Sequence, residues 1–416
     1  MAERRGRAVA AEVAKPEGTA DSAPLTVPTG GGAHVVEFEL SDEQRSLRAV
    51  ARQFCEQQFS ESDVRTLMDT DDGFDRGVWR RLGRDVGLLG LSFPPQYGGA
   101  GAGLVDLALV AEELGRAVAP VPFVGTVGLA ATALRAAADA GTGEEATELL
   151  ARIADGEAVV ALAATDARGA WAPAQPTVTA AETDGAWRLS GVQAHVVDGA
   201  AADAVLVLAG VDGGQGLFHV ESAAAGLVRE PQSGLDLTRR QARLRYRDTP
   251  AVLLAEPAVA AAAVAAARDT AAVILAAEAV GGAQRLLDMS VEYARTRLQF
   301  GRTIGSFQAV KHRCADMLVE VEHARSVAYH AAFAADAGTD ADETRLAADL
   351  ATVVSAETYL QVAKSTVQVH GGIGFTWEHP THLYYKRAVS DAALLGGRAA
   401  AVDRLAGAVL EPVPAS

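Results

Sequence analysis

The sequence predicts a mainly helical α+β protein, with helices at both ends of the chain and a small β domain between them. Two changes in the spacing of apolar residues along the chain predict this class. Apolar residues recur every three or four positions in the first third, alternate with polar residues from about residue 158, and return to the helical spacing from about Ala258. The 416 residues exceed one ordinary domain, so we expect several.

Four segments are expected along the chain. Residues 1–35 are rich in Ala, Pro, Gly and charge and have neither apolar period, which predicts a disordered tail. Residues 36–157 are predicted to form an N-terminal helical domain, 158–255 a central β domain, and 256–410 a C-terminal helical bundle.

The first predicted helix begins at Ser41, because Gln44 three residues later completes a capping-box pattern. Leu47, Val50 and Phe54 then supply its apolar face. Two more helices follow from residues at the same spacing: Trp79, Leu82 and Val86 in one, and Leu104, Leu107, Ala111 and Leu114 in the other.

The predicted strands are short apolar runs separated by Gly, Asp and Pro turns, at Val159–Leu162, Val192–Val197 and Val205–Leu208. The clearest strand is Gln241–Arg247, in which apolar and polar residues alternate. Two long helices are then predicted from continuous apolar stripes: Phe307, Val310, Cys314, Met317, Val321, Ala324 and Ala328 in the first, and Leu346, Leu350, Val353, Leu360, Ala363 and Val367 in the second.

Composition excludes several classes of protein. The formal charge of −16 argues against nucleic-acid binding, which needs a surplus of Lys and Arg. Two cysteines, Cys55 and Cys314, form neither a disulfide framework nor a metal cluster, so we expect no metal. We find no strongly apolar run long enough to span a membrane and no secretion signal, and we expect a cytoplasmic protein.

Two segments are candidates for chemistry. Arg295, Arg297 and Arg302 cluster in an otherwise acidic chain, which is typical of a diphosphate site; the alternative is that they complete a helix terminus. In Gln368–Phe375, glycines would let a ligand approach the backbone, although the same pattern also ends helices. We expect His370 within it to be structural.

Taken together, these segments resemble the acyl-CoA dehydrogenase family from Glu39 to about Leu405. The motifs that carry the resemblance, in chain order, are Pro95–Gly99, Glu112–Gly115, Arg297–Gly301 continuing to Met317, and Gln368–Phe375. The resemblance implies a helical domain, a β domain and a four-helix bundle, usually assembled as a dimer of dimers. It also implies FAD bound between two subunits.

The resemblance assigns two sets of FAD contacts. Contacts lent to a neighbour's FAD would be Arg297, Gln299, Phe300, Gln368, Gly371 and Gly372, and all are intact. The chain's own flavin would be bound by Thr165, but the family's Trp-Ile-Thr strand reads His195-Val196-Val197, and Arg398 replaces a Thr that helps to hold FAD.

The resemblance also implies a carboxylate base that takes a proton from the acyl thioester. Gly396 stands at the usual Glu position, and the alternative position found in some relatives is Ala271, followed by Ala272. Glu278 is a weak candidate for a relocated base, its alternative being a helix surface residue. Asp269 is expected to match the family's structural or CoA-facing Asp.

These substitutions remove the chain's own flavin contacts and keep the lent ones. We therefore expect an FAD-dependent acyl-CoA dehydrogenase, or a subunit of a heteromeric one that completes its partner's FAD site. The substrate would be a thioester of CoA or of an acyl carrier protein, and the electron acceptor an electron-transfer flavoprotein. The alternatives are a non-redox dehydratase or isomerase on the same scaffold, and a non-catalytic structural subunit.

Overall fold

The structure is a computed structural model that describes residues 39–141, 144–338 and 340–410. The described residues from Asp42 onward form one compact unit. The tail expected at 1–35 lies outside the described residues.

Short helices build the first part of this unit, as predicted. They are α1 (Asp42–Gln58), α2 (Glu61–Met68), α3 (Arg76–Arg80), η1 (Arg81–Asp85), η2 (Pro95–Tyr97), α4 (Leu104–Arg116), η3 (Phe123–Ala131), α5 (Thr132–Asp139) and α6 (Glu144–Ala154). Trp79, Leu82 and Leu107 are buried as expected. Val50 is 46% exposed, so the face predicted for α1 is wrong there, and Ala51 and Cys55 are buried beside Phe54 instead.

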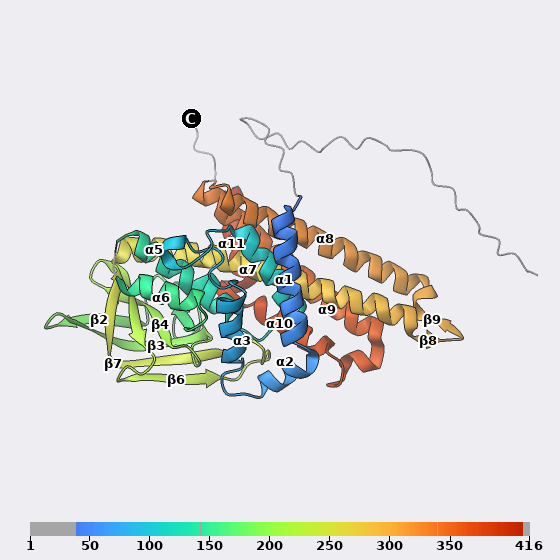
Figure 1. Ribbon diagram of the computed structural model, residues 1–416, viewed down its shortest axis with the longest axis horizontal. Helices are drawn as coiled ribbons and strands as arrows, with labels where there is room; N and C mark the ends of the chain where they lie inside the picture. The colour runs from blue at the N-terminus through green and yellow to red at the C-terminus, as the bar shows by residue number, and fades with distance from the viewer. Residues whose placement is uncertain (1–38, 142–143, 339, 411–416) are drawn as a thin grey trace, which may run out of the picture. The chain divides into compact units, whose positions relative to one another are not determined.

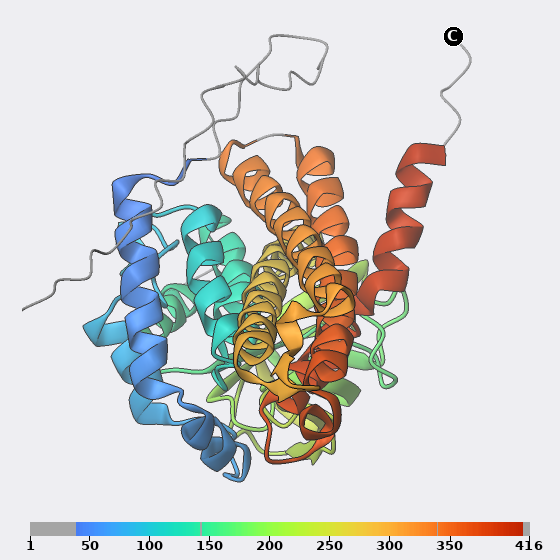
Figure 2. The same cartoon turned by 90° about the vertical axis from the view of Figure 1, so that its right-hand side faces the viewer.

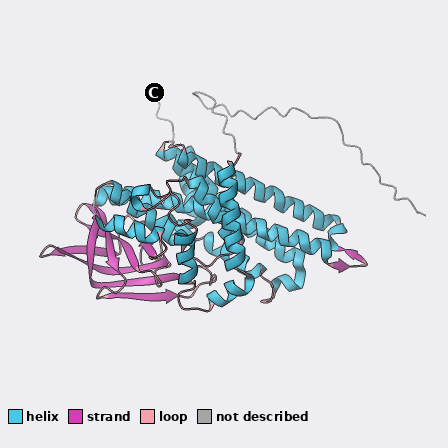
Figure 3. Ribbon diagram, viewed as in Figure 1, coloured by secondary structure: helices cyan, strands magenta, loops and turns pink. Residues whose placement is uncertain are grey.

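The strands form one seven-stranded sheet at one end of the unit (Figure 3). They are β1 (Val160–Ala163), β2 (Val178–Thr183), β3 (Ala186–Val197), β4 (Ala204–Val211), β5 (Gly214–Glu221), β6 (Leu227–Gln232) and β7 (Gln241–Ala255). The pairings β4–β2–β3–β7–β5–β4 close into a ring, which leaves few unpaired strand edges. The alternation predicted at the start of β7 is confirmed, since Ala242, Leu244 and Tyr246 are buried.

Long helices build the last part of the chain. They are α7 (Pro257–Thr296), α8 (Gln308–Asp336), α9 (Ala341–His370), α10 (Thr381–Asp391) and α11 (Gly397–Leu410), with the hairpin β8 (Leu298–Gln299) and β9 (Arg302–Thr303) between α7 and α8. Short turns η4 (Ile304–Ser306), η5 (Gly371–Phe375) and η6 (Leu394–Gly396) connect them. Figure 2, viewed from the β8–β9 end, shows α1 and α4 beside α7, α8 and α9.

The predicted apolar face of α9 is rotated relative to the buried one. Leu350 is 42% exposed, whereas Ala347, Ala351, Tyr359 and Val362 are buried. Small residues face α7 and α8 because they let the helix axes approach closely. In α8 the prediction holds better, since Met317, Val321, Ala324 and Ala328 are buried.

Helix α7 contradicts one expectation from composition. Among the described residues it alone is long and apolar enough to cross a membrane, with an 18-residue window of mean hydropathy 1.7. Many alanines and few charges produce this value. However, 56% of that window is buried in the protein, against α4, α8 and α9, and burial in a core accounts for an apolar helix without a membrane.

Candidate functional site

The first candidate site is a cavity between the β domain and the turn η6. Its volume is about 240 Å³, and Leu129, Leu162, Val197 and Leu394 give it apolar walls. The remaining lining includes Thr165, Arg168, Trp171, His195, Gln241 and Leu395. Thr165, predicted as a flavin contact, therefore lies in this wall.

Three of the polar side chains of this cavity, those of Thr165, His195 and Gln241, have partners within the chain. The Thr165 hydroxyl donates to the Ala194 carbonyl at 2.6 Å. The His195 Nδ1 lies 2.8 Å from Gln241 Oε1, so Nδ1 carries the proton and donates it. The loop after Thr165 also covers His195, since a Cβ at Gly169 would stand 2.6 Å from the imidazole Cδ2. The chain's own groups thus occupy the hydrogen-bonding positions of Thr165 and His195.

Gly396 lies in a turn that only glycine adopts easily. Three consecutive residues have a positive φ: Leu395 at +57°, Gly396 at +87° and Gly397 at +67°. Left-handed backbone is costly for residues with a Cβ, so the turn disfavours a Glu here. Position 396, where the family base would stand, contributes no proton acceptor from its side chain.

Glu278 is buried rather than at the helix surface, which overturns the surface alternative. Its side chain is 6% exposed, and its oxygens lie 2.6 and 2.7 Å from the Arg239 guanidinium and also contact Arg387. Arg387 in turn donates to Asp236 at 2.8 Å, and Arg239 pairs with Asp391. Glu278 does not line the cavity at Thr165, and its ion pairs give it a structural role.

The other carboxylate near the alternative base position is Asp269. It pairs with Arg268, its neighbour in the chain, and burial raises the pKa of Asp269. Ala271 and Ala272 are buried, and a Cβ at Gly128 would touch Ala271 at 3.4 Å. The alternative base position is therefore packed against η3.

The second candidate site lies at the end of α7. Arg297 caps this helix and starts the β8–β9 hairpin, whose tip carries Gln299 and Phe300. The Phe300 side chain is 90% exposed, with a left-handed φ of +53°. Within the described residues the Arg297 guanidinium has no carboxylate partner, so it is free to bind an anion.

The glycine-rich segment lies beside this hairpin. Gln368 is exposed in the last turn of α9, and Gly371 and Gly372 follow it in η5. A Cβ at either glycine would meet nothing within 4 Å, which leaves their backbone open to a ligand. Tyr293 of α7 stacks on His370 at 4.5 Å between ring centroids, which joins the two segments.

The cavity lies against the β domain, whereas the exposed set, which is Arg297, Gln299, Phe300, Gln368, Gly371 and Gly372, lies on β8–β9, the end of α9 and η5. Figure 1 shows the sheet at one end and β8, β9 and the end of α9 at the other. The structure therefore places the whole exposed set on these elements, whereas Thr165 follows β1 in the β domain.

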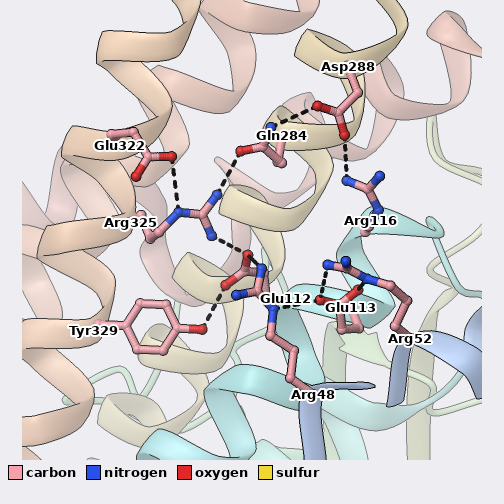
Figure 4. Close-up of polar contacts among 10 residues, drawn as sticks. All are labelled: Arg48, Arg52, Glu112, Glu113, Arg116, Gln284, Asp288, Glu322, Arg325 and Tyr329. Carbon is pink, nitrogen blue, oxygen red and sulfur yellow. Dashed lines mark hydrogen bonds and ion pairs between the residues drawn. The ribbon is translucent and has the colours of Figure 1, made fainter. Parts of the chain in front are cut away.

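The pair Glu112–Glu113, which belongs to one of the motifs of the sequence analysis, has a structural role. Glu113 receives hydrogen bonds from Arg48 and Arg52, and Glu112 receives one from Tyr329 at 2.7 Å. Figure 4 shows the polar network around these two carboxylates, which also includes Arg116, Gln284, Asp288, Glu322 and Arg325. It connects α1, α4, α7 and α8.

Comparison with known proteins identifies the family. The sequence matches the acyl-CoA dehydrogenase N-terminal domain over residues 41–157 and the acyl-CoA dehydrogenase C-terminal domain over residues 259–410. The chain belongs to the acyl-CoA dehydrogenase family. The resemblance and the fold class inferred from sequence motifs are thereby confirmed.

Individual acyl-CoA dehydrogenases align over most of the chain. Acyl-CoA dehydrogenase IpdE2 of Mycobacterium tuberculosis is 37% identical over 370 residues, which cover 89% of this chain and 98% of IpdE2. A variant of the Tcur3481–Tcur3483 steroid ACAD has a TM-score of 0.79 at 34% identity, covering 89% and 98% of the two chains. The ChsE4–ChsE5 complex from Mycobacterium tuberculosis has a TM-score of 0.79 at 28% identity, covering 91% and 100%.

Sequence reasoning missed several residues around both sites. It did not single out Trp171, which lines the cavity, or Trp377, His379 and His382, which surround the glycine-rich turn. The three histidines in Gln368–His382 were a usable signal, because imidazoles so close in sequence after a helix end are able to stack.

Proposed function

We propose that this chain is a subunit of a heteromeric, FAD-dependent acyl-CoA dehydrogenase and that it completes the FAD site of a partner chain. The partner would hold the flavin ring and supply the base. The observation that carries this proposal is the placement of the exposed FAD-binding set at the end of the helices remote from the chain's own β-domain cavity.

The chain's own cavity does not fit a flavin beside an acyl thioester. Its volume of about 240 Å³ is below the roughly 300–1,000 Å³ of pockets that enclose a typical small ligand. Its polar atoms are engaged within the chain, at Thr165 and His195. The flavin contact expected from Thr165 is therefore not part of our proposal.

The exposed set does fit the diphosphate half of FAD. The Arg297 guanidinium offers a planar fork for a phosphate, and the open backbone at Gly371 and Gly372 permits close approach of an anion. Gln368 and Gln299 offer both donors and acceptors, and Phe300 adds an exposed ring. When bound, FAD would accept a hydride from the substrate, while these residues would only bind and orient the cofactor.

The relatives support a two-chain assembly. Two of the structures that align with this chain carry paired names, Tcur3481–Tcur3483 and the ChsE4–ChsE5 complex, and the former is called a steroid ACAD. We propose a matching pair here, with an acyl thioester as substrate and an electron-transfer flavoprotein as acceptor.

The test is to co-express this chain with candidate partner chains and measure bound FAD by its visible absorption, before and after adding an acyl thioester. We expect a colourless chain alone and a yellow complex that bleaches. Arg297→Ala in the complex should weaken FAD binding about tenfold, the loss of about 1.4 kcal/mol.

Arg345→Ala is the matched control, because this arginine is exposed near the opposite end of α9 and should leave FAD binding unchanged. A yellow, bleachable chain without any partner would overturn the proposal. A complex that forms without FAD would instead indicate a structural subunit.

A further inference from the structure

Three histidines and two other aromatic residues surround the turn Gly371–Phe375. The His370 ring stacks on Tyr293 with an interplanar angle of 23° and meets His379 at 4.4 Å on the other side. Further along, Trp377 stacks on His382 at 4.4 Å. The two ends of the turn are thus joined by direct ring contact between His370 and His379.

Hydrogen bonds fix the orientation of these rings. His370 Nδ1 donates to the Thr366 carbonyl at 2.9 Å, because a carbonyl only accepts. His379 Nδ1 accepts from the Thr381 backbone N–H at 3.3 Å and lies 2.6 Å from its hydroxyl. His370 therefore carries a proton on Nδ1, His379 accepts at Nδ1 as a neutral ring, and both ring planes are fixed.

The turn itself has few other contacts that could hold it. Phe375 is 85% exposed and Ile373 is 43% exposed, and a Cβ at Gly371 or Gly372 would touch nothing. Gly374 is the exception, since its Cβ position lies 2.8 Å from the His370 Cβ. The position of the turn therefore depends on His370 and on the segment that His379 anchors.

We propose that the contact between His370 and His379, together with the stacking of Tyr293 on His370, positions the Gly371–Phe375 turn for the FAD of the partner chain. The inference rests on the proposed function and adds positioning residues to it. These residues act through the turn and do not touch the cofactor themselves.

The arrangement also makes the turn sensitive to pH. Burial lowers the pKa of His370, His379 and His382, and the neighbouring His370 charge further lowers that of His379. The charged and titratable groups that face the rings are Glu61 and Arg65 of α2, Tyr293 of α7 and Lys386 of α10. Because cations outnumber the one carboxylate, protonation would push the rings apart.

The decisive experiment compares variants in the complex with the FAD-bearing partner and in the chain alone. His370→Ala and His379→Ala should each weaken FAD binding about tenfold at about pH 7.5. In the chain alone, both should speed hydrogen exchange of the amides from Gly371 to Thr376. His370→Phe keeps the ring contact and should rescue both properties to within about threefold of the wild-type values.

Acidification gives a second readout that a purely structural role would not move. Lowering the pH to about 5.5 should release FAD from the wild-type complex, and His370→Phe should reduce this release because one titrating ring is gone. His330→Ala, an exposed histidine on α8, is the control and should behave as wild type.

The outcomes separate the two hypotheses. If His370→Ala and His379→Ala bind FAD like wild type with unchanged exchange, the positioning role is wrong while the proposed function stands. If the wild-type complex binds no FAD, the proposed function fails, and the exchange rates of the chain alone still decide whether the ring contact holds the turn.

Discussion

At the scale of single residues, Glu278 shows how one carboxylate determines the charge balance of the interior. It lies between Arg239 and Arg387, which come from the loop before β7 and from α10. All three side chains are nearly buried, at 5%, 2% and 6% exposure for the two arginines and Glu278. Arg387 also contacts Asp236 and Arg239 also contacts Asp391, so removing Glu278 takes one of two ionic partners from each buried arginine.

Glu278→Gln should therefore destabilise the protein by about 3 kcal/mol, because each arginine loses its shared ionic partner. The measurement is urea unfolding followed by circular dichroism. Glu357→Gln is the control, since that carboxylate is 46% exposed and 3.6 Å from Arg398, and it should cost less than about 1 kcal/mol. Equal effects of the two changes would contradict the role assigned to Glu278.

At the scale of elements, the crossing of α4 and α7 determines how closely the N-terminal helices approach the C-terminal ones. A Cβ at Gly281 would lie 1.8 Å from the Glu112 carbonyl oxygen, and one at Gly115 would lie 2.0 Å from the Glu278 carbonyl oxygen. Each glycine faces the backbone of the other helix. At this close crossing, Glu278 can reach Arg239 and Arg387, and Glu112 can reach Tyr329 and Arg325.

Gly281→Ala should lower the free energy of unfolding by about 2–3 kcal/mol, because the new methyl group forces the helices apart. Thermal unfolding of the purified variant measures this. Gly407→Ala on α11 is the matched control: nothing lies within 4 Å of its Cβ position, and alanine there should stabilise by about 1 kcal/mol. An unchanged melting temperature for Gly281→Ala would show that the crossing is loose.

At the scale of the whole molecule, one buried cluster connects the helical segments to the β domain. Arg387 of α10 donates to Thr238 at 2.6 Å and to Asp236 before β7, while Arg239 joins Asp391. Asp391 also has one buried oxygen without a hydrogen bond among the described residues. Burial raises the pKa of Asp391 to about 7, although Arg239 opposes this shift.

A pH dependence of stability follows from this shift. The native Asp391 keeps its proton at pH values where the unfolded chain, with the ordinary value of 3.8, has released it. Its contribution to stability is therefore full below about pH 3.8 and is lost as the pH rises toward about 7. Asp391→Asn removes this titration.

We expect the difference in unfolding free energy between wild type and Asp391→Asn to fall steadily from about pH 4 to about pH 7. Chemical denaturation at several pH values measures it. A difference that is constant over this range would mean that Asp391 is ionised in the native protein throughout.

Sequence patterns were enough for much of the fold and for the exposed half of the site. Alternation located β7, and the helical spacing located α8 and α9, because these periods arise from backbone geometry alone. Arg297 and the glycines of η5 could be predicted as ligand-binding candidates because they are short motifs, contiguous in sequence, whose chemistry does not depend on distant residues. The domain boundaries and a cytoplasmic location stay predictions.

Tertiary structure decided what depends on distant parts of the chain. The buried face of α9 could not be read from sequence, because its alanines form a second stripe and only packing against α7 and α8 selects it. The burial of Glu278 likewise required Arg239 and Arg387. These arginines lie 39 and 109 positions away in the sequence and meet Glu278 only in the fold. The sequence by itself determined which groups are candidates for FAD binding, and the tertiary structure decided that they lie on the β8–β9 hairpin and in η5, because this placement depends on how α7 packs against α9.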